Sequence, residues 1–259
     1  MGLNTVHLVY PHEDRINCPH AIGRKVGEYL RQKYNVRYYA VDGFERIQPE
    51  EGDILLGHAQ PAPFTPFRRS IRDPRWRRII LMCPYNADPM QVGFLDSLMP
   101  CCHAFLAITG HYWIRHLDGS LFSHWKPKMR HLDLAVDRND FPFIKVLFNK
   151  PGQRKFLYIG NQIWCKNTGY LSAIAAAMPD VDFGWIGGER RPIRHVARLG
   201  PQDFRLKESR EQVANYDYLI TVGSADANPA TILEAMAWGL IPVCTPTSGY
   251  ENHPGIINI

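Results

Sequence analysis

Short apolar segments alternate with helix-forming segments along almost the whole chain of 259 residues. Strands are expected at 6–10, 36–39, 54–56, 79–82, 104–108, 130–134, 156–159, 181–186 and 218–222. Helices are expected between them, at 21–33, 91–99, 111–117, 168–178 and 208–215. Because a crossover helix must join two neighbouring parallel strands, this alternation predicts an α/β fold built on parallel sheets.

The length of the chain allows one large α/β domain or two of ordinary size. A polar segment that contains proline and glycine, residues 149–153, is typical of a linker. We therefore expect two Rossmann-like domains, residues 1–150 and 151–259, that face a cleft. In such folds ligands bind at the carboxyl ends of the strands.

The composition excludes several classes of protein. Hydrophobic residues make up 45% of the chain, and no run approaches the roughly 18 apolar residues of a membrane span. The N-terminus lacks the basic region and long apolar core of a signal peptide. Six cysteines are scattered without a Cys-x-x-Cys pair, which indicates buried thiols in a reducing compartment and no zinc site. We expect a cytoplasmic protein without a bound metal.

The net charge of +5 is unevenly distributed, because six arginines fall between residues 67 and 78. They are Arg68, Arg69, Arg72, Arg75, Arg77 and Arg78. Such a cluster could meet anionic lipid head groups, at about 1 kcal/mol per residue, on the inner membrane surface. The alternative is a solvated face, since Asp73 and Pro74 interrupt any continuous helix here. No basic motif interleaved with aromatic residues accompanies the cluster, so nucleic acid is not an expected partner.

The most informative segment spans residues 226–243 and indicates an acidic loop, a helix, a tight stop and a buried strand. Asn228 is suited to the N-cap of the helix, Pro229 to its first position and Gly239 to its C-terminal cap. Apolar residues at helical spacing mark a core-facing stripe: Ile232, Leu233, Met236, Ala237 and Leu240. Glu234 lies outside that stripe.

The start of this helix is suited to a nucleotide. Free N–H groups and the positive end of the helix dipole favour an anion, so a phosphate could sit at residues 228–230, that is Asn228, Pro229 and Ala230. Glu234 could then accept hydrogen bonds from a neighbouring hydroxyl group. A diphosphate at the helix end and a ribose at the carboxylate would fit this arrangement.

The same segment resembles the donor-site signature of retaining GT-B glycosyltransferases, the family 4 (group 1) type. The resemblance rests on two acids, Asp226 and Glu234, separated by seven residues and followed by Ala-Met-Ala-x-Gly-x-x-Pro-Val. It implies two Rossmann-like domains, a nucleoside-diphosphate-sugar donor and no cofactor. Asp226 would contact the transferred sugar near the reacting carbon. The family usually has Glu at that position, in Glu-x-Phe-Gly, whereas this chain has Asp-Ala-Asn-Pro.

Further donor-binding positions follow from the resemblance. The family has Gly-Arg-x-x-x-x-Lys in the loop after the first strand of its second domain. Gly160 and Lys166 match this pattern, while Asn161 replaces the arginine with a neutral amide. Gly188 and Glu189 end a later strand at which backbone would approach the base or ribose, although a plain tight turn explains them equally well.

In the first domain the family often carries a histidine after a strand that faces the donor sugar. The equivalent segment, residues 81–86, has no histidine, and Asn86 is the candidate catalytic residue at this position. His58, which follows the expected strand 54–56, is the other candidate catalytic residue. Family members typically continue for several more strands and helices, whereas this chain stops at Ile259. The resemblance therefore implies a second domain that is incomplete at its C-terminus.

The sequence predicts a retaining transferase that moves a sugar from a nucleotide-sugar to an acceptor, neither of which it identifies. Two alternatives stay open. The absent arginine favours a degenerate module that binds a nucleotide-sugar without catalysis, and an epimerase of nucleotide-sugars could use the same fold.

Overall fold

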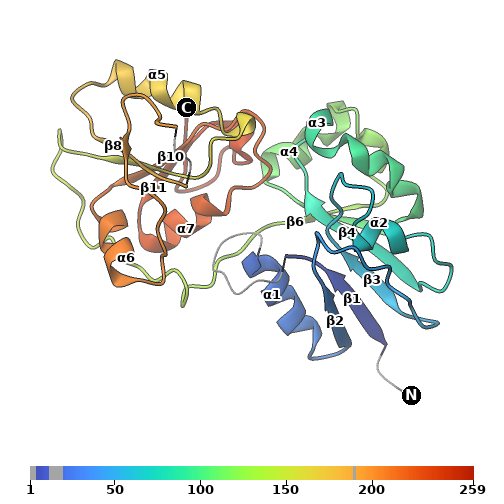
Figure 1. Ribbon diagram of the computed structural model, residues 1–259. Coiled ribbons are helices and arrows are strands. Elements are labelled where there is room, and N and C mark those ends of the chain that lie inside the picture. The colour runs from blue at the N-terminus through green and yellow to red at the C-terminus, as the bar shows by residue number, and fades with distance from the viewer. Residues whose placement is uncertain (1–3, 12–19, 189–190) are drawn as a thin grey trace. The chain divides into compact units, whose positions relative to one another are not determined.

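The computed structural model describes residues 4–11, 20–188 and 191–259 (Figure 1). The chain forms two compact units. The first unit comprises Met1–Ile108 and His116–Leu132, and the second comprises Thr109–Arg115 and Asp133–Ile259. Residues 133–150, which the sequence analysis assigned to the first domain, therefore group with the second unit, as does the short segment Thr109–Arg115.

The first unit contains a six-stranded sheet in the order β2-β1-β3-β4-β5-β6. The strands are β1 (Thr5–Val9), β2 (Asn35–Tyr39), β3 (Ile54–Gly57), β4 (Arg78–Pro84), β5 (Ala104–Ile108) and β6 (Met129–Leu132). All neighbouring strands pair in parallel, with Val6 opposite both Val36 and Ile54. The central strands are almost entirely buried, as is typical of a parallel sheet covered on both faces.

Short helices connect these strands. They are α1 (His20–Leu30), α2 (Pro66–Ser70) and α3 (Pro89–Val92), with 3-10 turns η1 (Gly93–Ser97), η2 (Met99–Cys101), η3 (Leu117–Gly119) and η4 (Ser123–Trp125). The single helix expected at 91–99 was wrong, because α3 ends after one turn and continues as 3-10 turns. Gly93 and Pro100 are the weakest helix formers in this stretch, and each lies where the helical pattern changes.

The second unit contains another parallel six-stranded sheet, in the order β12-β11-β10-β7-β8-β9. Its strands are β7 (Phe156–Ile159), β8 (Phe183–Ile186), β9 (Ala197–Arg198), β10 (Tyr218–Thr221), β11 (Ile241–Cys244) and β12 (Ile257–Asn258). The sequence analysis missed β9 and β12. Each has only two residues, which is too short for a hydrophobic pattern to identify.

Helices cover both faces of this sheet. They are α5 (Thr168–Ala177), α6 (Lys207–Ala214) and α7 (Ala230–Trp238). The second unit also contains α4 (His111–Arg115) and the 3-10 turns η5 (Trp164–Lys166) and η6 (Pro246–Ser248). Figure 1 shows α5 on one side of the strands and α6 and α7 on the other. Two separate apolar clusters agree with this, one containing Leu171 of α5 and the other containing Val213 and Ile232.

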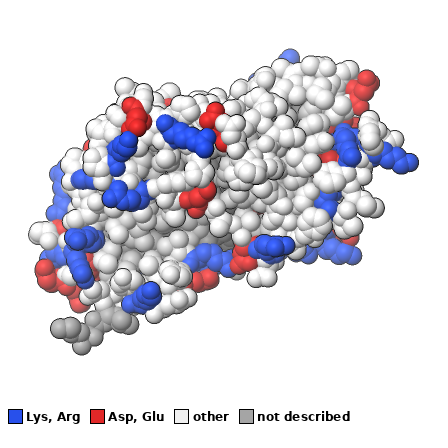
Figure 2. Space-filling model, turned by 180° about the vertical axis from the view of Figure 1, so that it is seen from behind, with Lys and Arg blue, Asp and Glu red and all other residues white. Residues whose placement is uncertain are grey.

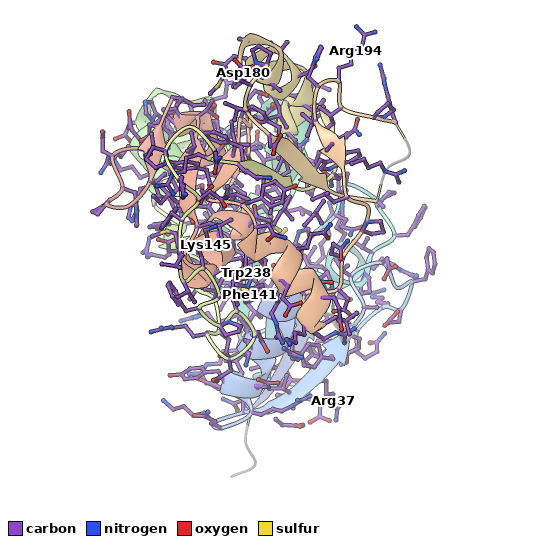
Figure 3. The ribbon with its side chains drawn as sticks, turned by 90° about the vertical axis from the view of Figure 1, so that its left-hand side faces the viewer. Arg37, Phe141, Lys145, Asp180, Arg194 and Trp238 are labelled. Atoms are coloured by element: carbon purple, nitrogen blue, oxygen red, sulfur yellow. The ribbon has the colours of Figure 1, made fainter. Side chains whose placement is uncertain are left out.

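The end of α7 anchors residues 133–150 to the second unit. Trp238 is fully buried, and the rings of Phe141 and Phe204 lie 5.5 and 4.9 Å from it (Figure 3). The Trp238 carbonyl accepts hydrogen bonds from the backbone N–H groups of Ile144 and Lys145, at 3.0 and 2.9 Å. These contacts explain why this segment belongs to the second unit, although its sequence gives no sign of them.

A buried ion pair completes this attachment. Lys145 Nζ lies 3.2 Å from Asp217 Oδ1, and both side chains are almost inaccessible. Asn149 donates to the same carboxylate from its backbone and its side chain, each at 2.8 Å. The polar segment expected as a linker is thus held firmly at one end.

None of the described helices is long and apolar enough to cross a membrane. Five of the cysteines lie in the described residues, and all five are free thiols: Cys83, Cys101, Cys102, Cys165 and Cys244. Within the described part of the chain, no group of three or more potential ligands could hold a metal ion.

Candidate functional site

The candidate site lies in the second unit, where the loops after β7 and β10 leave the sheet. These strands are neighbours, so their carboxyl ends bring both loops together. Lys166 of the first loop forms an ion pair with Asp226 of the second, and their side chains are 19% and 12% exposed. The Ser224 N–H also donates to the Cys165 carbonyl, at 2.9 Å. Two predicted site residues 60 positions apart are therefore in direct contact.

The loop that carries Lys166 is held by its own hydrogen bonds. Lys166 belongs to η5, and its backbone N–H donates to Ile163, at 2.9 Å. The Asn161 side chain accepts from the Ile163 N–H at 3.4 Å, and its carbonyl accepts from the Tyr158 hydroxyl at 2.6 Å. Asn161 thus supports the loop, and it brings no positive charge to the site.

Two glycines approach each other where β7 and β8 end. A Cβ atom at Gly187 would lie 2.6 Å from the Gly160 carbonyl oxygen, which accepts a hydrogen bond from the Trp185 indole at 2.9 Å. Packing within the protein therefore requires glycine at position 187. Nothing described lies within 4 Å of a Cβ atom built at Gly188, which is exposed beside this strand end. Glu189 lies outside the described residues.

The backbone around Asp226 is fixed by a segment more than a hundred residues earlier. The Trp113 indole Nε1–H donates to the Asp226 carbonyl at 2.7 Å, and the Gly110 N–H donates to the Ala227 carbonyl at 2.8 Å. A side chain at Gly110 would collide with the backbone of Gly249. Sequence reasoning missed both residues, because nothing local to Gly110 or Trp113 indicates their partners.

The start of α7 differs from the prediction. Asn228 is not the N-cap, since the helix begins at Ala230 and Pro229 occupies the cap position without a side-chain hydrogen bond. The Asn228 amide instead donates to Asp133 at 3.1 Å, and its oxygen accepts from the Tyr250 hydroxyl at 2.6 Å. The Asn228 side chain therefore bonds to these two partners and does not cap the helix. Among the described residues, no side chain accepts from the N–H groups in the first turn of α7, although the Ile232 N–H donates to the Pro229 carbonyl at 3.1 Å.

The other end of α7 agrees with the prediction. Gly239 caps the helix in the left-handed conformation, with φ of 91°. Only glycine adopts such a conformation without strain, so this residue ends the helix as its sequence indicates.

Glu234 is the most unusual residue of the site. Although it lies outside the apolar stripe of α7, it is only 6% exposed. Its carboxyl group forms no hydrogen bond or ion pair with any residue that the structure describes, and burial raises its pKa to about 8. An isolated buried carboxyl group is costly, and its oxygens are available to donors from a bound molecule.

The two candidates from the first domain lie at the carboxyl ends of β3 and β4, in the first unit. Within the described residues His58 Nδ1 is buried without a hydrogen-bond partner, and burial lowers the pKa of this histidine to about 4. Asn86 is buried, and its side chain accepts from the Asp88 N–H at 3.2 Å. Both are neutral near pH 7, and Asn86 supports the turn before α3.

No protein-family model matches the chain, and no curated protein sequence matches it. Solved structures do resemble it. An α-glucosyltransferase in complex with UDP-glucose and DNA containing an abasic site has a TM-score of 0.60 at 10% identity, over 96% of this chain and 81% of that one. The lipopolysaccharide outer core galactosyltransferase WaaB has a TM-score of 0.62 at 11% identity, over 93% and 80%.

A third similar structure is the catalytic domain of starch synthase IV from Arabidopsis thaliana, bound to ADP and acarbose. It has a TM-score of 0.60 at 11% identity, over 99% of this chain and 86% of that one. Identities this low establish a shared fold. The chain therefore has the GT-B fold that the resemblance implied, and each of its two α/β units carries a parallel six-stranded sheet.

Proposed function

We propose that this protein is a glycosyltransferase that moves a sugar from a nucleoside-diphosphate sugar to an acceptor. The observation that carries the proposal is Glu234, a buried carboxyl group without a partner among the described residues, in the same unit as the Lys166–Asp226 pair. Residues that serve only the fold are normally satisfied when buried. An unsatisfied acceptor beside an uncapped helix start fits a ligand with hydroxyl groups and an anion.

The roles of the residues follow from their chemistry and, for Asp226, from the resemblance of residues 226–243 to the donor-site signature. The N–H groups in the first turn of α7 and the ammonium of Lys166 would hold the diphosphate. Glu234 would accept hydrogen bonds from the ribose, and Asp226 would contact the transferred sugar. The exposed strand end at Gly188 leaves room for the base.

Cleavage of the donor leaves negative charge on the departing diphosphate. Fixed cations and oriented N–H groups stabilise such charge without reorganising during the reaction. Lys166 is already held near the site by its pair with Asp226, so a bound diphosphate would compete for its ammonium. Transfer with retention of configuration rests on the resemblance of residues 226–243 to retaining enzymes. The proposal requires no metal or other cofactor.

A second candidate is a module that binds a nucleotide-sugar without transferring it. Asn161 favours it, because this residue supplies a neutral amide that supports its own loop where the resembled enzymes have an arginine. One cation would then bind the diphosphate without stabilising its departure enough for catalysis.

Binding is the first test of the proposal. A panel of nucleoside diphosphates and nucleotide-sugars would be titrated against the wild type, Lys166→Ala and Glu234→Ala by thermal shift and calorimetry. We expect one base to bind the wild type and both variants to lose at least about tenfold in affinity. Absence of binding by any nucleotide would contradict the proposal.

Two matched variants control for nonspecific effects of charge. Lys155→Ala removes a lysine that pairs with Asp182 at 2.8 Å, at the other end of β7. Glu211→Ala removes an exposed glutamate that pairs with Lys207 in α6. Both should bind nucleotide as the wild type does.

Release of nucleoside diphosphate then separates the candidates. Slow hydrolysis of the bound donor, accelerated by an acceptor, supports the transferase. Tight binding without any turnover supports the module, and interconversion of the sugar without an acceptor would indicate an epimerase.

A further inference from the structure

Two phenylalanines of the first unit expose most of their side chains. Phe44 is 74% exposed and Phe64 is 65% exposed. Single exposed apolar residues are common on protein surfaces. Packing within the fold does not explain two exposed aromatic rings on neighbouring segments.

The segments that carry these rings lie side by side. The Arg69 guanidinium donates a hydrogen bond to the Phe44 carbonyl, and the Ile47 N–H donates to Ser70 Oγ at 2.8 Å. Phe64 lies two residues before α2, which contains both Arg69 and Ser70. Ile47 and Phe67 are buried beneath, so the two exposed rings belong to a supported surface.

Arginines outnumber acidic residues on the two segments that carry the rings. The two segments, residues 44–47 and 61–72, contain four arginines and one glutamate, a net charge of +3. The arginines are Arg46, Arg68, Arg69 and Arg72. On the face that Figure 2 shows, lysines and arginines are interspersed with acidic residues. We name these four arginines with Phe44 and Phe64 the phenylalanine–arginine patch.

We propose that the phenylalanine–arginine patch binds the surface of an anionic lipid bilayer. Exposed phenylalanine rings can enter the boundary between head groups and acyl chains, and arginines beside them meet the lipid phosphates. Because no described helix could span a membrane, the contact is a peripheral one. The patch shares Arg68, Arg69 and Arg72 with the cluster noted in the sequence and omits Arg75, which pairs with Asp73 at 2.8 Å.

The contacts of the arginines favour lipid over nucleic acid. Arg68 donates to the Pro61 carbonyl and Arg69 to the Phe44 carbonyl, so both guanidinium groups are partly committed to the backbone. A duplex is held mainly by cations that contact successive phosphates. Here two exposed groups are aromatic rings, which a bilayer accommodates and a phosphate backbone does not.

The test is co-sedimentation with vesicles of pure phosphatidylcholine and of equal parts phosphatidylcholine and phosphatidylglycerol. We expect the wild type to bind the anionic vesicles only. Phe44→Ala with Phe64→Ala should weaken that binding by about tenfold or more. Arg46→Ala with Arg72→Ala should weaken it by about tenfold and reduce its dependence on salt.

The matched control replaces two other exposed apolar residues of the first unit, Tyr29 and Leu121, which are 64% and 74% exposed. Tyr29→Ala with Leu121→Ala should bind as the wild type does, and thermal melts would verify that all variants fold. Absence of wild-type binding to anionic vesicles would overturn the proposal. So would unchanged binding by the phenylalanine variant, or binding of a DNA duplex that depends on the same rings. Nucleotide binding is not needed for any of these outcomes.

Discussion

The second unit buries two carboxyl groups, one just before β10 and one on the helix α7 that follows this strand, and their surroundings are opposite. Asp217 precedes β10 and accepts hydrogen bonds from Asn149, Lys155 and Lys145. Burial alone would raise the pKa of Asp217, but these partners lower it to about 2. Glu234, in the middle of α7, has no partner among the described residues, and burial raises its pKa to about 8.

The difference separates a structural site from a candidate binding site. The partners of Asp217 attach residues 133–150 to the sheet, and all of them come from the protein itself. Glu234 lies on α7, the helix that follows β10, and a molecule with hydroxyl groups could supply the donors it lacks. Burial of an acid is therefore uninformative about function until its partners are known.

The largest effect is expected from removing a partner of Asp217. Lys145→Met would leave Asp217 buried beside weaker partners, and breaking such a pair costs about 3–5 kcal/mol. Chemical denaturation would measure this loss, while nucleotide affinity of the folded fraction should be unchanged. A loss below about 1 kcal/mol would mean that the pair does not hold the segment.

Glu234→Gln should increase stability in alkaline solution. Because the folded-state pKa of Glu234 is about 8 and its ordinary value is 4.5, the folded protein favours the protonated acid. Its contribution is present below pH 4.5 and is lost as the pH rises to about 8. Removing the charge should therefore stabilise the protein at pH 9 by on the order of 3 kcal/mol, and much less at pH 5.

The stability that Asp217 contributes changes with pH in the opposite direction, and the same measurement detects it. Its depressed pKa stabilises the fold above its ordinary value of 3.8, and that stability is lost as the pH falls toward 2. Denaturation midpoints of Glu234→Gln and the wild type across this range would reveal both slopes. Parallel curves for the two proteins above pH 5 would contradict the assignment for Glu234.

Lys166→Met tests the lysine of the candidate site against Lys145. Its pair with Asp226 is partly exposed, so its removal should cost less than about 1 kcal/mol of stability. Nucleotide affinity should fall by about tenfold to a hundredfold, because a charged hydrogen bond to the diphosphate is lost. Destabilisation as large as that of Lys145→Met would make Lys166 a structural residue.

Trp113→Phe should have the smallest effect. It removes the indole hydrogen bond to the Asp226 carbonyl and keeps an aromatic ring in place. We expect donor turnover to fall by about fivefold, with nucleotide affinity unchanged, and hydrogen exchange of the loop around Asp226 to accelerate. Trp76→Phe is the control, since Trp76 makes a similar 2.8 Å bond to the Ser70 carbonyl in the first unit. Equal turnover in both variants would exclude a positioning role for Trp113.

Local sequence patterns were sufficient to predict much of the fold. The alternation of apolar and helical segments predicted parallel sheets, and nearly every strand longer than two residues lies where it was expected. The sequence also predicted the helix Ala230–Trp238 and its C-terminal cap at Gly239. These features depend on residues within a few positions of one another, which is the range over which periodicity and capping act.

Only the tertiary structure decided what the site residues contact. The sequence made Asn228 a cap, but Asp133 and Tyr250 bind its side chain instead. It proposed Lys166 and Asp226 separately, and adjacent strands bring them together. Long-range partners leave no trace in local spacing, because they depend on where distant segments cross. For the same reason the sequence determined that Glu234 lies on a helix, and only the folded chain showed that nothing described beside it satisfies its carboxyl group.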